Sequence, residues 1–276
     1  MSERGSVRVE RDGPLASLVL DRPEKRNALT GEMLARIRDV LAGARADREI
    51  RVLLLRGEGL DFCAGLDLTT VDAGEAAEDR MEREEADLFA EVLALRDHPT
   101  PTVAVVQGAC IAAGLLLSQA CDLVVASEDA SFYNPLARMG GVGLEVLFEP
   151  WDIGVRRAKR HLFTGERIPA DLALRLGMVT DVVPRAELVP AATALARRIA
   201  AMPPVALRLL KRSLNRTQDL MGMRNALEYH FALHEFGHGT EECRRLLHEA
   251  RRGRPLREFF ARRDEGPDPA DPPAGA

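Results

Sequence analysis

The feature that most constrains the fold of this chain is a regular alternation of apolar and amphipathic segments in its first half. Residues 50–55, 102–107 and 123–126 are short apolar runs, typical of strands that are buried on both faces. Residues 79–97 and 113–120 lie between these runs. The first segment predicts a charged helix with a set of apolar positions near its end, and the second predicts a helix of small residues. Because strand, turn, helix and strand recur, the sequence predicts a layered α/β domain with a buried sheet.

The segments on either side extend this prediction. Residues 6–10 and 15–20 predict paired strands around the turn Asp12-Gly13-Pro14. Residues 31–46 predict an amphipathic helix that Thr30 caps. From about residue 151 onward the chain predicts helices, with one strand near residues 178–183. The expected helices are 152–163, 170–176, 185–201, 204–216, 219–236 and 241–251.

Length, charge and cysteine content limit the classes of function. The 276 residues suffice for one large domain, and 38 Lys and Arg against 43 Asp and Glu give a net charge of −5. This charge disfavours nucleic acid as the main partner, since phosphate binding needs a basic excess. The sequence has neither a membrane-length apolar stretch nor the apolar core of a signal peptide, and its four cysteines have no paired spacing. We therefore expect a cytoplasmic protein that binds neither nucleic acid nor a membrane.

Two turns that are rich in small residues follow the ends of predicted strands. They are LDFCAGLDL at residues 60–68 and VQGACIAAGLLLSQACD at residues 106–122. Small side chains let a ligand approach backbone N–H groups closely, and the second turn leads into a helix whose first N–H groups are unpaired. Two such N–H groups that converge on one point form an oxyanion hole. Close packing between layers is the alternative reason for small residues at these positions.

These turns and two further segments resemble the enoyl-CoA hydratase/isomerase (crotonase) superfamily. The matching segments occur in the family's order and together cover most of residues 8–216. The resemblance implies a crotonase-like spiral of ββα units, a helical C-terminal region used in trimerisation, and an acyl-CoA substrate. The segments are DRPEKRNALT at 21–30, DFCAGLDL at 61–68, VQGACIAAGLLLSQACDLVVASEDASF at 106–132 and LFTGERIPADLALRLGMVTDVVP at 162–184.

The expected organisation has three parts. Residues 1–203 form the crotonase-like core, residues 204–263 form the C-terminal helical region, and residues 264–276 form a Pro-rich tail that we expect to be disordered. The helical region is rich in Leu and Ala, and one domain is not expected to bury all of it. We therefore expect a homotrimer or a hexamer. No cofactor is expected beyond the CoA that is part of the substrate.

The resemblance also assigns residues that bind the substrate. The oxyanion hole falls on the backbone N–H groups of Leu66 and Ala113, the second of which is often glycine in the family. Lys25 and Arg26 match the segment that binds the CoA nucleotide, where their charge suits phosphate, although ordinary surface charge is the alternative. The expected substrate-binding residues that accompany them are Ala64, Gly65, Asp67, Leu68, Leu116, Leu136 and Asn134.

The catalytic acids depart from the family pattern. Typical hydratases use two glutamates to activate and position water, and these positions fall on Leu116 and Leu136. Leucine cannot transfer a proton, so the standard two-glutamate hydration lacks its usual groups. The segment GVGLE, which ends at Glu145, resembles the place of a catalytic Asp in 4-chlorobenzoyl-CoA dehalogenase and the dienoyl-CoA isomerases. We expect the apolar neighbours of Glu145 to raise its pKa toward a useful value.

Other polar groups remain open as alternatives near the substrate. Glu145 could instead face solvent or pair with Arg138. Glu149 would be the acid if the local alignment is shifted, and Tyr133 and Asn134 are further polar candidates.

Three histidines follow one another at intervals of four residues near the C-terminus. His230, His234 and His238 would share one face of a straight helix, and such a stripe can bind zinc. Gly237 and Gly239 indicate that the helix ends near His238, and no cysteine or carboxylate cluster obviously completes a site. We therefore expect a polar helix face or a subunit contact, and no metal.

The sequence thus predicts an enzyme that transforms acyl-CoA, a lyase or isomerase of the enoyl-CoA hydratase/isomerase type. Isomerisation, or hydration with an unusual acid, fits a single carboxylate, while thioester hydrolysis and decarboxylation use the same oxyanion hole. A non-catalytic acyl-CoA-binding protein is the rival from another class. RNA binding is a second rival, because a cluster of arginines lies near the C-terminus. Subunit contacts or binding of the CoA phosphates are the expected roles of this cluster. It consists of Arg244, Arg245, Arg251, Arg252 and Arg254.

Overall fold

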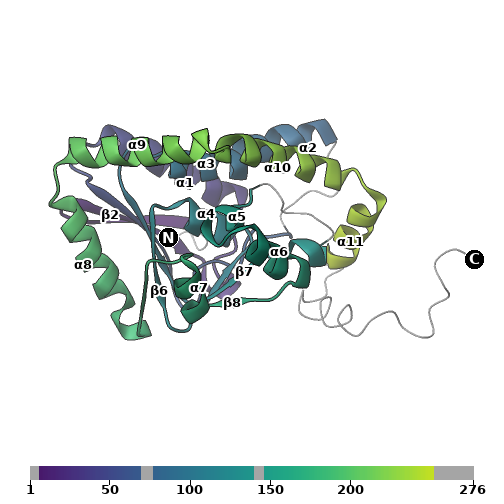
Figure 1. Ribbon diagram of the computed structural model, residues 1–276, viewed down its shortest axis with the longest axis horizontal. Coiled ribbons are helices and arrows are strands. Elements are labelled where there is room, and N and C mark those ends of the chain that lie inside the picture. The colour runs from purple at the N-terminus through teal and green to yellow at the C-terminus, as the bar shows by residue number, and fades with distance from the viewer. Residues whose placement is uncertain (1–5, 70–76, 140–145, 252–276) are drawn as a thin grey trace, which may run out of the picture.

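The computed structural model describes residues 6–69, 77–139 and 146–251 (Figure 1). A six-stranded sheet has the order β1-β2-β3-β4-β6-β9, in which β1 and β2 are antiparallel and all other neighbours are parallel. A small second sheet has the order β5-β7-β8. The strands of the large sheet are β1 (Ser6–Asp12), β2 (Leu15–Asp21), β3 (Val52–Gly57), β4 (Thr102–Val106), β6 (Leu123–Ser127) and β9 (Asp181–Val183).

The first strands and the first helix confirm the sequence prediction. Strands β1 and β2 pair over their full length around the turn at Gly13. Helix α1 (Gly31–Ala46) begins at the predicted cap, where the Thr30 hydroxyl accepts a hydrogen bond of 3.3 Å from the N–H of Met33. The buried side of α1 repeats at helical spacing and comprises Met33, Leu34, Ile37, Leu41 and Ala44.

The large sheet is buried on both faces, as its apolar strands predict. Successive residues of a strand point to opposite faces, so β3 and β4 supply two different cores. Leu53 and Ala104 join the core beneath α1, α3 (Ala90–Arg96) and α4 (Ala113–Ala120). Leu54 and Val103 join a second core under α8 (Leu188–Ala200). The sheet therefore lies between two helical layers.

The predicted helix at 79–97 is present with an irregular centre. Helix α2 (Ala77–Glu84) passes into a π-helical turn over Glu85–Phe89 and then into α3. The extra residue per turn rotates the face of the helix, and Leu88 and Phe89 are buried there.

The small sheet was not expected from the sequence. It consists of β5 (Ala109–Ile111), β7 (Ser131–Tyr133) and β8 (Ile168–Pro169). Strands of two or three residues carry no periodic signal, and their partners are far away in the chain. This sheet matters for function because β5 is part of the second small-residue turn and leads into α4.

The second half of the described chain is helical, as predicted. The short helix α5 (Glu149–Asp152) precedes α6 (Val155–Thr164) and α7 (Ala170–Leu176). Figure 1 shows α9 (Pro204–Leu220) and α10 (Met223–His238) in a row along one edge of the molecule, followed by α11 (Glu241–Arg251). The Pro-rich tail at 264–276 lies outside the described residues. Within the described ranges, no helix has both the length and the apolar character to cross a bilayer.

Candidate active site

A parallel β-bridge between Cys63 and Cys110 joins the two small-residue turns. The N–H of Cys63 donates to the carbonyl of Ala109 at 3.0 Å, and the N–H of Ile111 donates to the carbonyl of Cys63 at 2.9 Å. These bonds hold the first turn parallel to β5, which leads directly into α4. Residues that are almost 50 positions apart in the sequence are therefore fixed side by side.

Glycine allows the turns to approach this closely. A Cβ atom on Gly65 would lie 3.1 Å from the Cβ of Ala112 and 3.7 Å from the backbone nitrogen of Ala113. Gly65 also has a φ of +99°, which side chains disfavour. Gly65, which the resemblance places in the substrate site, therefore lies beside Ala113.

The backbone bends sharply just before α4. Ala112 has φ +48° and ψ −118°, an uncommon conformation for a residue with a side chain. Its N–H donates to the carbonyl of Tyr133 at 3.0 Å, which ties the bend to β7. Such strain persists only where the surroundings hold it, and it is concentrated at functional sites.

The N–H groups of Leu66 and Ala113 are available to a ligand. Among the described residues, neither group donates a backbone hydrogen bond, while the neighbouring N–H of Asp67 donates to Leu29 at 2.8 Å. Ala113 is the first residue of α4, where the N–H groups of a helix have no partner within it. The arrangement presents two donors from adjacent turns, as an oxyanion hole requires.

Asp67 holds the first small-residue turn in place through hydrogen bonds of its side chain. Its buried carboxylate accepts hydrogen bonds from Arg22 at 2.7 Å and from the hydroxyl of Thr69 at 2.6 Å. Burial alone would raise the pKa of Asp67, but these hydrogen bonds outweigh it and lower the pKa, so the group is ionised. Leu68, the next residue, is half-buried.

The predicted CoA-binding segment lies against the same turn. The N–H of Ala64 donates to the carbonyl of Arg26 at 2.9 Å. The guanidinium of Arg26 donates to the Asp61 carboxylate at 2.7 Å, and this contact raises the pKa of Arg26. Lys25, at the end of a short helical turn over Pro23–Lys25, is exposed. Part of the charge of Arg26 is thus already balanced, whereas Lys25 faces solvent.

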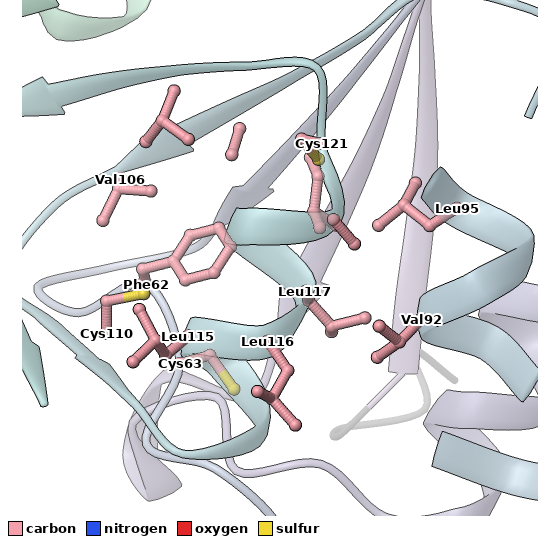
Figure 2. Packing of buried hydrophobic residues seen from close by; sticks show 14 of the residues in the cluster. Phe62, Cys63, Val92, Leu95, Val106, Cys110, Leu115, Leu116, Leu117 and Cys121 are labelled. Atoms are coloured by element: carbon pink, nitrogen blue, oxygen red, sulfur yellow. The ribbon is translucent and has the colours of Figure 1, made fainter. Parts of the chain in front are cut away.

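The two leucines that replace the family's glutamates are buried. Leu116 has 1% of its surface exposed, and Leu136 has 5%. Figure 2 shows Leu116 on α4 between Leu115 and Leu117, with Leu117 directed toward Val92 of α3. An apolar lining therefore stands where two carboxylates would be expected.

The expected acid Glu145 lies outside the described residues. Glu149, the alternative acid, is buried at the start of α5, and its Oε1 accepts a hydrogen bond of 2.8 Å from the Nδ2 of Asn134. Its Oε2 has no hydrogen-bond partner in the described part of the chain. Burial raises the pKa of Glu149 above its ordinary value, so its protonated form is favoured.

Glu149 lines a small cavity with Asn134, Tyr133 and Leu115. The cavity measures about 10 Å³, which leaves room for about one water molecule. Leu115 lies two residues beyond Ala113, and the carbonyl of Tyr133 holds Ala112, so the cavity adjoins the segment that carries the second N–H donor. The structure thus brings together Asn134, Tyr133 and Glu149 from the sequence-based candidates.

Sequence reasoning missed Asp152, which joins this acidic group. Its Oδ2 accepts a hydrogen bond of 2.9 Å from Gln119 of α4. Burial, and then the charge of Glu149, raise the pKa of Asp152 to about 7. The separation of three residues would have placed Glu149 and Asp152 on one face of a helix, but only the fold reveals that this face is buried.

Comparison with known proteins identifies the family of the chain. The family model described as Enoyl-CoA hydratase/isomerase matches residues 10–249. EchA13 of Mycobacterium tuberculosis, named for an inferred enoyl-CoA hydratase activity, is 38% identical over 82% of this chain and 78% of its own length. The hydroxycinnamoyl-CoA hydratase-lyase of Pseudomonas fluorescens is 31% identical over 80% of this chain and 82% of its own.

The structural comparison gives the same answer. An enoyl-CoA hydratase/isomerase from Xanthobacter autotrophicus Py2 superposes with a TM-score of 0.82 at 32% identity, covering 95% of this chain and 98% of that one. The chain belongs to the enoyl-CoA hydratase/isomerase family. It has the crotonase fold of that family and is an acyl-CoA-processing enzyme.

Proposed function

We propose that this chain polarises the carbonyl of an acyl-CoA thioester between the N–H groups of Leu66 and Ala113. The observation that carries the proposal is the pair of available donors on two turns that the Cys63–Cys110 bridge holds together. Proton loss from the acyl group, or attack on the thioester, builds negative charge on the carbonyl oxygen. Each donor of such a hole typically lowers the barrier by about 3 kcal/mol.

We propose Lys25 as the group that attracts the CoA phosphates. Its exposed ammonium lies next to Arg26, whose carbonyl holds the oxyanion turn through Ala64. A CoA phosphate bound at Lys25 would therefore lie on the same segment that holds the first oxyanion turn, so phosphate binding would help to position the thioester. Arg26 contributes less, because Asp61 already balances its charge.

A single carboxylate, Glu145, is the proposed proton carrier. In an isomerisation it would take a proton from one carbon of the acyl group, leaving an enolate that the two N–H groups stabilise. The same carboxyl group would then return that proton to another carbon, so no water is consumed. The apolar side chains of Leu116 and Leu136 support this chemistry over the two-glutamate hydration, because neither can orient water.

Glu149 is the second candidate for this role. Its support is a buried carboxyl group with a raised pKa beside Asn134 and a cavity of about 10 Å³. A protonated carboxyl in such a place can act as an acid at neutral pH. Hydration with an unusual acid, hydrolysis, decarboxylation and simple acyl-CoA binding are the alternatives that an assay must separate.

The test compares Glu145→Gln with Glu149→Gln on a panel of enoyl-CoA and other acyl-CoA thioesters. Loss of the true proton carrier should lower turnover by about 10²–10⁴-fold and remove one limb of the pH–rate profile. Acyl-CoA affinity should stay nearly constant in both variants, because the N–H donors remain. A parent protein that binds acyl-CoA but turns over no member of the panel would favour the non-catalytic alternative. Crotonyl-CoA hydration by the parent at a rate typical of the family would contradict the argument from Leu116 and Leu136.

Assembly into a trimer or a dimer of trimers is part of the proposal. Helix α9 buries a single side chain, Lys211, and exposes a series of apolar ones in the described structure. Such a surface is typical of an interface between subunits. The exposed side chains on α9 are Val205, Leu209, Leu210, Leu214 and Leu220. Light scattering at micromolar concentration tests this, and a stable monomer would contradict it.

A further inference from the structure

Helices α2 and α10 bring three metal-binding side chains together where they pack against each other. The Nε2 atom of His234 lies 2.7 Å from Oε2 of Glu84 and 3.1 Å from Nε2 of His238. Nε2 of His238 lies 3.6 Å from the same oxygen of Glu84. Figure 1 shows α2 beside α10 at the same edge of the molecule. The sequence alone showed no carboxylate near the three histidines of α10. The fold brings Glu84 to His234, although the two residues are 150 positions apart in the sequence.

Hydrogen bonding alone does not account for these short contacts. A neutral imidazole nitrogen carries either one proton or one lone pair, so Nε2 of His234 can make one ordinary hydrogen bond. It nevertheless lies within hydrogen-bonding distance of both Glu84 and His238. If the Nε2–H of His234 donates to Glu84, that nitrogen has no lone pair left for His238 at 3.1 Å, so only one of the two contacts of His234 is an ordinary hydrogen bond. A cation that accepts a lone pair from each group satisfies all three.

The triangle of donor atoms has the dimensions of a metal site. With sides of 2.7, 3.1 and 3.6 Å, the three atoms share a point slightly above their plane that is about 2 Å from each. This is the length of zinc bonds to imidazole nitrogen and carboxylate oxygen. The Oε1 atom of Glu235 lies 3.8 Å from Nε2 of His234.

The surroundings suit a divalent cation. His234 and His238 are buried, and Glu84 is nearly so. The other oxygen of Glu84 accepts a hydrogen bond of 3.3 Å from Arg83, which fixes the direction of the carboxylate. Two neutral imidazoles and one carboxylate form the mixed nitrogen and oxygen set that zinc prefers.

We propose that Glu84, His234 and His238 bind one divalent transition-metal ion, with Zn²⁺ as the best fit. The ion links α2 to α10. It thereby holds α2 in place, and α2 is the helix that follows the first small-residue turn in the sequence. One turn before His234, the ring of His230 accepts the N–H of Leu147 at 3.3 Å, so α10 also contacts the segment after Glu145. The metal role is structural and does not depend on the reaction that the enzyme carries out.

Metal content of the full-length protein tests the proposal directly. The protein is stripped with EDTA, incubated with ZnCl₂, freed of excess metal by dialysis and analysed by mass spectrometry. We expect one zinc ion per chain and a higher midpoint of thermal unfolding with zinc than without it. Cobalt in place of zinc should give the visible absorption of a four-coordinate site.

Variants on α2 and α10 make the test specific. His238→Ala and Glu84→Gln should lose the bound equivalent, with zinc affinity reduced more than about 100-fold. His230→Ala is the matched control, because it removes a histidine one turn from His234 that is not a ligand, and it should keep the full equivalent. Glu84→Gln preserves size and removes charge, so a folded protein is available even if His238→Ala folds poorly. Less than a tenth of an equivalent in the parent, or full binding by Glu84→Gln, would overturn the proposal.

Discussion

Gly114 packs so closely on Cys63 that a Cβ atom at Gly114 would lie 2.6 Å from both the Cβ and the carbonyl oxygen of Cys63. This contact sets the distance between α4 and the first small-residue turn. The carbonyl of Cys63 is itself engaged by the N–H of Ile111, so it has little freedom to move. The closeness of the two proposed oxyanion donors therefore depends on the absence of one methyl group.

Gly114→Ala should destabilise the protein and reduce activity. The added methyl group overlaps backbone atoms, and overpacking of this kind costs about 1–3 kcal/mol of unfolding free energy. The displacement of α4 also moves the N–H of Ala113, and a shift of about 1 Å typically lowers turnover by about 100-fold. Urea unfolding and acyl-CoA turnover measure the two effects.

Gly43→Ala is the matched control for that substitution. Gly43 lies on the exposed side of α1, and nothing is within 4 Å of the position that its Cβ would take. Alanine should therefore raise the free energy of unfolding by about 0.5–1 kcal/mol and leave activity unchanged. Equal effects of the two substitutions would show that the packing of Gly114 on Cys63 has no special role.

Ala113→Pro removes the second N–H donor, but proline also disfavours the φ of +48° and ψ of −118° at Ala112, so a folded variant is required for the test. Ala113 is the first residue of α4, a position at which proline is tolerated because its N–H has no helical partner. Turnover should fall by about 10²–10³-fold if this N–H stabilises the oxyanion. Ala113→Gly keeps the donor and should retain activity. Full turnover by a folded proline variant would remove Ala113 from the site.

The sequence predicted the parts of the fold that repeat regularly. Helix α1 occupies the predicted residues because its apolar spacing and the Thr30 cap are local signals, and α4 occupies the predicted segment of small and apolar residues. The resemblance supplied Leu66 and Ala113, and the structure brings their turns together through the Cys63–Cys110 bridge.

The rest of the site depends on contacts that local patterns do not encode. Strands β5, β7 and β8 are too short for a periodic signal, and their partners are distant in the chain. Asp152 resembles any helix carboxylate in the sequence, and only packing shows its contact with Gln119. Glu84 meets His234 across 150 residues, a relationship that spacing cannot reveal.

Glutamates introduced at positions 116 and 136 test whether the two leucines account for a loss of hydratase activity. Leu116→Glu and Leu136→Glu each place a carboxyl group at a buried position, which should cost several kcal/mol of stability at neutral pH, about 2–7 kcal/mol for an unpartnered polar group. If the double variant folds and gains crotonyl-CoA hydration that the parent lacks, the parent has diverged toward other chemistry. Leu116→Gln with Leu136→Gln is the control, because it adds polarity without a titrating proton. Hydration by this control equal to that of the glutamate variant would contradict a proton-transfer role for the restored acids.

The raised pKa of Asp152 predicts a particular dependence of stability on pH. The group titrates near its ordinary value of 3.8 in the unfolded chain and at about 7 in the folded protein. Between these values the folded state binds more protons, so the free energy of unfolding should fall as the pH rises from about 4 to 7. The loss should be on the order of 1–4 kcal/mol, with Glu149 adding to it in the same direction because its pKa is also raised.

Asp152→Asn should remove most of this dependence. Asparagine retains an oxygen that accepts the hydrogen bond from Gln119, but it does not ionise. The variant should therefore match the parent at pH 4 and exceed its stability at pH 8, and Glu149→Gln in the same background should raise the stability at pH 8 further, because the pKa of Glu149 is also raised. Urea unfolding at fixed protein concentration across this pH range measures both. The prediction is wrong if the stability of the parent rises from pH 4 to pH 8 and Asp152→Asn has the same stability as the parent at each pH. That result would mean that Asp152 is ionised in the folded protein and that its contact with Gln119 is open to water.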